Sequence, residues 1–152
     1  MHRTLSKTTL AFLAFLAPLS LNAEEKKDDS FIVRKIREVG ENAKLERVQA
    51  NFSSLSSCLK IYKLNAGFYP TQEQGLLALV EKPATAPIPR RWTQVMEKAD
   101  KALTDPWDRP YHYQVRNKDG KVEYVVSSDG PDKADPKDDM ESVVDAEAVE
   151  KK

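Results

Sequence analysis

The order of patterns along the chain predicts an α+β domain in which a long N-terminal amphipathic helix packs on a small antiparallel β-sheet. Between residues 45 and 62, apolar side chains recur at alternating spacings of three and four, which is typical of a helix with one buried face. Between residues 111 and 126, apolar and polar side chains alternate on either side of a tight turn, which indicates a β-hairpin. No internal repeat interrupts this order, so we expect one domain with one core.

Residues 1–23 have the pattern of a secretory signal peptide. Two basic residues precede an apolar run from Leu10 to Leu21, and the small residue Ala23 is followed by acidic side chains. The alternative is an uncleaved membrane anchor, but the run has 12 residues and contains Pro18, whereas a spanning helix needs about 20. We therefore expect cleavage after Ala23, export to the periplasm, and no stable membrane span in the mature protein.

The composition of the mature chain limits the classes of function. Removal of residues 1–23 takes away two basic and no acidic side chains, which leaves 22 Lys and Arg against 24 Asp and Glu, a formal charge of −2. This balance gives no indication of nucleic acid binding. The remaining 129 residues suffice for one domain. Cys58 is the only cysteine, so we expect no internal disulfide and a thiol that packs as a small apolar side chain.

Residues 24–44 are expected to form a solvated leader followed by a helical stalk. Residues 24–30 contain no apolar side chain and have nothing to contribute to a core. Ordered structure should begin near Phe31, where one long helix starts that runs to Leu64. Gly40 costs about 1 kcal/mol relative to alanine inside a helix, so it is the expected division between the stalk and the docked half of the helix.

The domain itself is expected to span residues 45–140, and its helix to bury one face against the sheet. That face holds the apolar residues with the three-four spacing: Leu45, Val48, Phe52, Leu55, Leu59 and Tyr62. A coiled-coil seam is the alternative explanation of this spacing, but the pattern covers fewer than three heptads and lacks complementary charges beside it. Packing in a core is therefore the better interpretation.

Two shorter helices are expected between the long helix and the hairpin. Thr71 and Gln74 form a capping box ahead of an apolar run that ends before Pro83. Prolines make residues 83–91 an irregular connection, since they cannot sit inside a helix or a central strand. A third helix is expected over residues 93–103.

The hairpin is expected to turn at Asp119 and Gly120, because these residue types favour the left-handed backbone of a two-residue turn. Residues 127–139 are rich in aspartate and contain two prolines, and so are expected to form a loop. The stretch from Met140 to Lys152 carries little apolar surface. We expect it to form at most a helical turn or two, and residues 141–152 to be a polar tail.

Two longer stretches are more specific than these patterns. Residues 67–80 have the sequence GFYPTQEQGLLALV, and residues 105–113 have the sequence DPWDRPYHY. Tyr-Lys-Leu-Asn precedes them at residues 62–65, and a Pro-x-Pro-x-x-Trp segment at residues 87–92 separates them. In this order they resemble the major pseudopilin of type II secretion systems, pseudopilin G, in its periplasmic domain. The resemblance covers roughly residues 45–130. The matched aromatic residues and prolines are expected to serve the fold, because such residues in a small core usually serve packing.

The resemblance also implies a calcium site in the polar loop, because the corresponding loop of that family binds one calcium ion. Matched position by position, the ligands would be Asp129, Asp138, Asp139 and the main-chain carbonyl of Val126. Carboxylate and carbonyl oxygens suit calcium or magnesium rather than zinc, and a long loop tolerates the loose geometry of calcium better than the strict octahedron of magnesium. The family's central glycines are replaced here by Pro131, Lys133, Ala134 and Pro136. A loop that is simply solvated is the alternative.

The implied function is that of an exported structural or interaction module that binds protein components of a secretion or pilus-type machine. The N-terminus departs from the family, whose members carry a basic leader, a Gly-Phe cleavage point and a continuous apolar helix for the filament core. Without that helix, this chain is not expected to build a pilus in the usual way. The alternative is a free-standing periplasmic calcium-binding or adaptor protein, since fold does not fix function. Catalysis is not expected, because the mature chain keeps a single histidine, His112.

Overall fold

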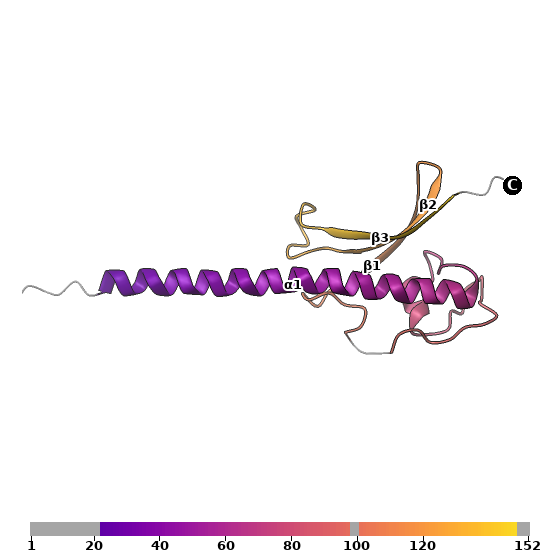
Figure 1. Ribbon diagram of the computed structural model, residues 1–152, viewed down its shortest axis with the longest axis horizontal. Coiled ribbons are helices and arrows are strands. Elements are labelled where there is room, and N and C mark those ends of the chain that lie inside the picture. Colours follow the sequence, from indigo (N-terminus) through magenta and orange to yellow (C-terminus); the bar gives the residue numbers. More distant parts are fainter. Residues whose placement is uncertain (1–21, 98–100, 149–152) are drawn as a thin grey trace, which may run out of the picture. The chain divides into compact units, whose positions relative to one another are not determined.

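The computed structural model describes residues 22–97 and 101–148 (Figure 1). Its elements follow in the order α1 (Asn22–Ala66), the short 3₁₀ helix η1 (Leu76–Leu79), β1 (His112–Lys118), β2 (Lys121–Ser128) and β3 (Met140–Ala148). One long helix followed by a three-stranded antiparallel sheet confirms the predicted α+β class. The predicted signal peptide, residues 1–23, lies outside the described residues apart from its last two positions.

The helix α1 runs through two compact units of the chain, which divide after Arg37. It begins at Asn22, so the prediction that order begins near Phe31 is wrong. Residues 24–30 have no apolar side chain to bury, but glutamate and lysine favour helices, and no proline or glycine interrupts them. Gly40 lies inside the continuous helix, and the two units divide three residues before it. In the part of the chain that the structure describes, no helix is both long and apolar enough to span a bilayer.

The core of the second unit lies between the helix and the sheet. Five residues on one face of α1 are at most 2 % exposed: Val48, Phe52, Leu55, Leu59 and Tyr62. They confirm the predicted buried face, while Leu45, its sixth predicted member, is half-buried. Tyr113 and Val126 of the sheet belong to the same core, and the ring of Tyr111 lies 5.7 Å from that of Phe52. Burial of each such side chain contributes about 1.5–3 kcal/mol, so this face is a main source of stability.

The sheet has the strand order β1-β2-β3, and both neighbouring pairs are antiparallel. β1 and β2 form the predicted hairpin, in which Tyr113 lies opposite Val126. Its turn places Asp119 at φ 50° and Gly120 at φ 73°, the left-handed conformation that a two-residue turn of this kind needs at both positions. The predicted turn is therefore confirmed. Figure 1 shows the sheet alongside the second half of α1.

β3 overturns the prediction for the end of the chain. Residues 141–148 belong to a strand and not to a polar tail, and the described stretch from Met140 contains no helical turn. Val144 is the buried residue of this strand and the extra residue where the register shifts by one. β3 is ordered by its pairing with the whole length of β2. A strand that docks through backbone hydrogen bonds needs few apolar residues, so composition alone underestimates it.

The predicted second helix forms only in part. Its capping box is present, because the Gln74 N–H donates to Thr71 Oγ1 and the Thr71 N–H donates to Gln74 Oε1, each over 3.2 Å. Turns and the 3₁₀ helix η1 then follow in place of an α-helix. Gly75, at φ 56° and ψ −160°, leaves the helical conformation directly after the box, so the turn does not continue as an α-helix.

The predicted third helix over residues 93–103 is wrong for the described part of that range, which contains no helix. The backbone N–H groups of Val95 and Met96 donate instead to the carbonyl of Leu79, over 3.0 and 3.1 Å. Donors that a helix would use within itself therefore attach this segment to η1. The connection over residues 83–91 is irregular, as predicted.

Candidate functional site

The polar loop between β2 and β3, residues 129–139, starts from a buried hydroxyl. Ser128, the last residue of β2, is 1 % exposed. Its hydroxyl donates to Asp105 Oδ2 over 2.8 Å and accepts the N–H of Gly130 over 3.3 Å. The start of the loop is therefore bound to a residue that lies 23 positions earlier in the chain.

Asp105 is the anchor of this region, and its carboxylate is fully buried. Its Oδ1 accepts the N–H groups of Trp107 and Arg109, each over 2.9 Å, and Arg109 Nε lies 3.5 Å from its Oδ2. A buried carboxylate needs such donors around it, because it has lost its water. Asp105 was not predicted as an anchor. The sequence holds a signal for it, since an aspartate directly before a proline is the residue type that binds backbone N–H groups two residues on.

The four residues predicted as calcium ligands do not share one set of contacts. Val126 lies in the middle strand of the sheet and is paired with both neighbouring strands. Asp129 Oδ1 is 2.9 Å from Nε2 of His112, at the start of β1. Asp139 is exposed. These three residues therefore have separate surroundings.

Asp138 is the predicted ligand whose carboxylate contacts the loop itself. Its Oδ2 accepts the N–H of Asp132 over 2.9 Å. Its Oδ1 is buried and has no hydrogen-bond partner among the residues that the structure describes. A buried carboxylate oxygen without a donor is a favourable place for a cation. Asp138 therefore fits an oxygen ligand set.

The rest of the loop is held by contacts between its own residues. The N–H of Ala134 donates to Asp132 Oδ1 over 2.9 Å. At Gly130, with φ 65°, an added Cβ would lie 2.2 Å from the carbonyl oxygen of Asp138, so a glycine is required where the chain crosses itself. Within residues 22–97 and 101–148, no three His, Cys, Asp or Glu side chains come together in a group that could hold a metal ion. The side chains thus present one candidate ligand, Asp138, rather than an assembled set.

A second polar cluster joins β3 to the C-terminal half of α1. Lys63 Nζ forms ion pairs with Asp145 and Glu147. The hydroxyl of Tyr69 donates to Asp145 Oδ2 over 2.9 Å, and this bond, with help from the N–H of Ala146 and from Lys63, holds the pKa of Asp145 below its usual value. Burial, followed by the contact with Asp145, raises the pKa of Tyr69 far above its usual value. This cluster holds β3 in place, the strand that its composition did not predict.

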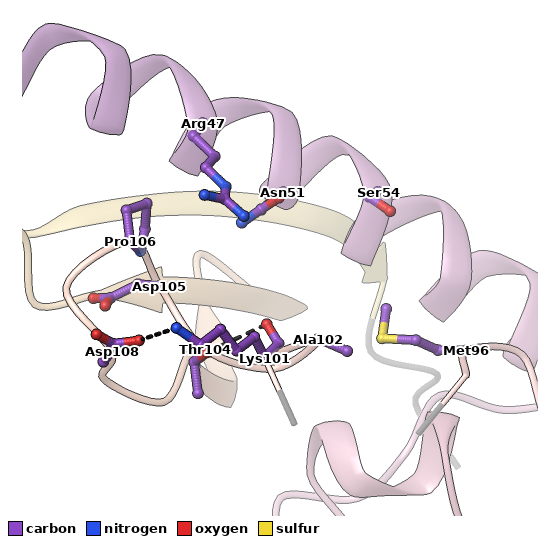
Figure 2. Close-up of a pocket in the computed structure, with 10 residues that line it drawn as sticks. All are labelled: Arg47, Asn51, Ser54, Met96, Lys101, Ala102, Thr104, Asp105, Pro106 and Asp108. Carbon is purple, nitrogen blue, oxygen red and sulfur yellow. Dashed lines mark hydrogen bonds and ion pairs between the residues drawn. The ribbon is translucent and has the colours of Figure 1, made fainter. Parts of the chain in front are cut away.

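A pocket of about 370 Å³ lies between α1 and residues 101–108, and Figure 2 shows the side chains that line it. Arg47 and Asn51 line it from the helix, and on the other side Lys101 Nζ lies 3.0 Å from Asp108 Oδ1. The described residues that line the pocket include no histidine and no cysteine. Its polar side chains are instead hydroxyls, carboxylates, an amide and basic groups: Arg47, Asn51, Ser54, Lys101, Thr104, Asp105 and Asp108.

A helix whose second half packs on a three-stranded antiparallel sheet, with an acidic loop before the last strand, defines a pseudopilin-like domain. The chain belongs to the family described as type II secretion system (T2SS), protein G, whose sequence model matches residues 35–146. The resemblance drawn from residues 67–80 and 105–113 is thereby confirmed.

Individual relatives and a solved structure agree with that family. The type II secretion system core protein G of Dickeya chrysanthemi is 36 % identical over 110 residues, which are 72 % of this chain and 70 % of that protein. The protein of the same name from Aeromonas hydrophila is 34 % identical over 102 residues, 66 % of this chain and 71 % of that protein. The crystal structure of the major pseudopilin from the type 2 secretion system of enterohaemorrhagic Escherichia coli matches with a TM-score of 0.54 at 29 % identity, over 84 % of this chain and 96 % of that one.

Proposed function

We propose that this chain is an exported structural module of a type II secretion system that binds protein components of that machine. The observation that carries the proposal is the family match over residues 35–146, together with relatives that are named as core proteins of that system. Aromatic residues of the two family stretches support a structural role, since Tyr69, Tyr111 and Tyr113 are at most 6 % exposed and belong to the core. Side chains so buried serve packing rather than chemistry on a substrate.

The test of this role is deletion of the gene in the source bacterium. Proteins that the machine releases should then accumulate in the periplasm, and the wild-type chain supplied from a plasmid should restore their release. Normal secretion by the deletion strain would contradict the role. That result would favour the alternative, a free-standing periplasmic adaptor protein.

Export is the second part of the proposal, and the signal-peptide pattern of residues 1–23 supports it. Signal peptidase would release a mature product that begins near Glu24. Fractionation of cells that express the full chain, followed by N-terminal sequencing, measures both the compartment and the cleavage point. A periplasmic product that begins near Glu24 supports export, whereas an intact N-terminus in the membrane fraction contradicts cleavage.

Calcium stabilisation of the β2–β3 loop is the third part. Asp138 supports it, because the buried Oδ1 lacks a donor and a cation would complete its surroundings. Asp129 and Asp139 are the proposed ligands at the two ends of the loop, with the carbonyl of Val126 as the main-chain ligand. To bind the ion, Asp129 would give up its contact with His112. When bound, calcium would supply positive charge that offsets the aspartates of the loop.

Melting curves recorded with calcium and with a chelator test this part. If the ion binds only the folded loop, calcium at 100 times its dissociation constant stabilises the protein by about 2.7 kcal/mol. Asp138→Asn should abolish the shift, while Asp119→Asn should keep it, because Asp119 lies in the turn at the opposite end of β2. Coincident curves at millimolar calcium, with no heat of binding, would show that the loop is simply solvated.

A further inference from the structure

A groove at the C-terminal end of α1 combines exposed apolar side chains with two arginines. It has a volume of about 450 Å³, and we call it the arginine groove after its main lining residues: Leu64, Phe68, Ile88, Arg90 and Arg91. Leu64 is 82 % exposed and Ile88 is 52 % exposed. None of the described residues that line the groove is an aspartate or glutamate. The groove is therefore both apolar and positively charged.

The two arginine side chains have no partner among the residues that the structure describes, while the backbone that carries them is fixed. Within the described ranges, neither Arg90 nor Arg91 takes part in a hydrogen bond, an ion pair or a ring contact. Pro89, directly before them, is fully buried, and the indole of Trp92, directly after them, donates a hydrogen bond to η1 over 2.9 Å. A rigid backbone lowers the entropy that is lost when these side chains bind an anionic partner.

The β2–β3 loop carries the opposite charge, at the other end of the second unit (Figure 1). Residues 129–139 contain five aspartates and two lysines, a formal charge of −3. Asp132 and Asp135 are exposed, and so are the neighbouring apolar residues Pro131 and Ala134. The loop thus offers carboxylates together with apolar surface, which is the complement of the arginine groove.

The loop cannot reach the groove of its own chain. It is anchored at Asp105, close to Trp107, whose indole donates to Glu41 of α1 over 3.2 Å. The groove begins at Leu64, 23 residues further along the same helix, which corresponds to about 35 Å of helix axis. A loop of 11 residues with both ends fixed extends at most about 20 Å from the sheet. The complementary surface must therefore belong to another molecule.

We propose that the arginine groove receives the β2–β3 loop of a second copy of this chain. Arg90 and Arg91 bind the exposed carboxylates of Asp132 and Asp135 through charge-assisted hydrogen bonds, and Leu64 packs on the apolar residues of the loop. Because the groove and the loop are different surfaces, the contact is heterologous and can repeat along a row of copies. The inference rests on the proposed structural role and names a surface through which that role is carried out.

Disulfide trapping in a Cys58→Ser background tests the contact. Leu64→Cys in one preparation and Ala134→Cys in another leave every charged residue in place. When mixed under mild oxidation, the two should form a heterodimer. The matched control pairs Ala134→Cys with Lys118→Cys, an exposed position beside the β1–β2 turn, and should remain monomeric. The cross-linking is carried out in two buffers, one with a chelator and one with calcium, because a bound ion would lower the negative charge of the loop.

Charge reversal then shows whether the arginines and aspartates carry the contact. Arg90→Glu with Arg91→Glu should lower the yield of the 64–134 cross-link on the order of tenfold, since like charges across an interface oppose docking. Asp132→Lys with Asp135→Lys in the partner should restore the yield. Melting curves of each variant verify that the fold is retained.

Three results would overturn the inference. The first is a 64–134 cross-link no stronger than the control in either buffer, and the second is a charge reversal without effect on its yield. The third is a dominant 64–64 dimer, because that contact joins like surfaces. If Arg90→Glu with Arg91→Glu restores secretion to the deletion strain as fully as the wild-type chain, this contact is unused while the proposed function stands.

Discussion

In the second unit, the buried face of α1 and the β2–β3 loop are stabilised in different ways. Val48, Phe52 and Leu59 on α1 are at most 2 % exposed and belong to a continuous apolar core. The loop depends instead on single polar contacts, such as the hydrogen bond from the Asp132 N–H to Asp138 Oδ2. The helix face should therefore respond to changes of buried volume, whereas the loop should respond to the loss of particular donors, acceptors and glycines.

The largest loss of stability is expected for Phe52→Ala, at the centre of the helix face. Phe52 is 2 % exposed, so removal of its ring should lower the free energy of unfolding by about 3–5 kcal/mol. The control on the same helix is Ile61→Ala, where the side chain is 47 % exposed and the change should stay within about 0.5 kcal/mol. Urea denaturation measures both. Similar values for the two variants would mean that this face of α1 lies outside the core.

Asp105→Ala tests the anchor of the loop and should cost about 2–4 kcal/mol, because the N–H groups of Trp107 and Arg109 and the hydroxyl of Ser128 would lose their acceptor. Asp105→Asn keeps one acceptor oxygen and should cost less. Denaturation curves of both variants provide the comparison. Asp139→Ala, at an exposed position of the loop, should be nearly neutral, and equal losses at residues 105 and 139 would contradict the anchor.

Gly130→Ala should cost about 2–3 kcal/mol, because the new Cβ would meet the backbone of Asp138 at a positive φ. The matched variant is Gly120→Ala in the hairpin turn. Gly120 also has a positive φ, of 73°, but nothing lies within 4 Å of its added Cβ, so backbone strain alone should cost about 1 kcal/mol. Chemical denaturation of the pair separates strain from crowding. Equal losses would show that the loop does not cross itself at Gly130.

The smallest effect is expected for Asp145 in the cluster that holds β3. The hydrogen bond from Tyr69 lowers the pKa of Asp145 in the folded protein. The ionised carboxylate therefore stabilises the fold at pH values above its ordinary pKa of 3.8, and this stabilisation is lost as the pH falls through the lowered pKa of the folded protein. Asp145→Asn should cost less than about 1 kcal/mol at neutral pH, because the side chain is partly exposed. The cost should shrink below about pH 4. Denaturation curves across this range measure it, and a cost that grows on acidification would contradict the sign.

The sequence was sufficient for the parts of the fold that follow a local pattern. The three-four spacing located the buried face from Val48 to Tyr62, and an Asp-Gly pair between two alternating runs located the turn at residues 119–120. Each of these features depends on residues that are close in the chain, so the periodicity of the sequence contains the information.

Two of the wrong predictions, those for β3 and for residues 93–103, concern segments that depend on partners distant in the chain. β3 is ordered by pairing with β2 and by Lys63, which lies 82 positions before Asp145. The segment that was expected to form a third helix donates its N–H groups to Leu79 instead. Composition and spacing do not contain such contacts.

The candidate site shows the same limit. Matching the loop position by position to the family named Asp129 and Asp138 as ligands of one ion. It could not show that Asp129 contacts His112, while Asp138 accepts a hydrogen bond from the N–H of Asp132. Those partners are set by the path of the loop, and the path is set by the crossing at Gly130 and not by the spacing of the acidic residues.

Amide hydrogen exchange tests the contrast between the two regions most directly. The amides of Val125 and Val126 lie in the central strand, where both side chains are at most 1 % exposed, and should exchange only on global unfolding. The amides of Asp132 and Ala134 bind carboxylates of the exposed loop. They should exchange through local opening, much faster than the strand in chelator and more slowly when calcium is added. Equal protection of the loop and the strand in chelator would contradict the account.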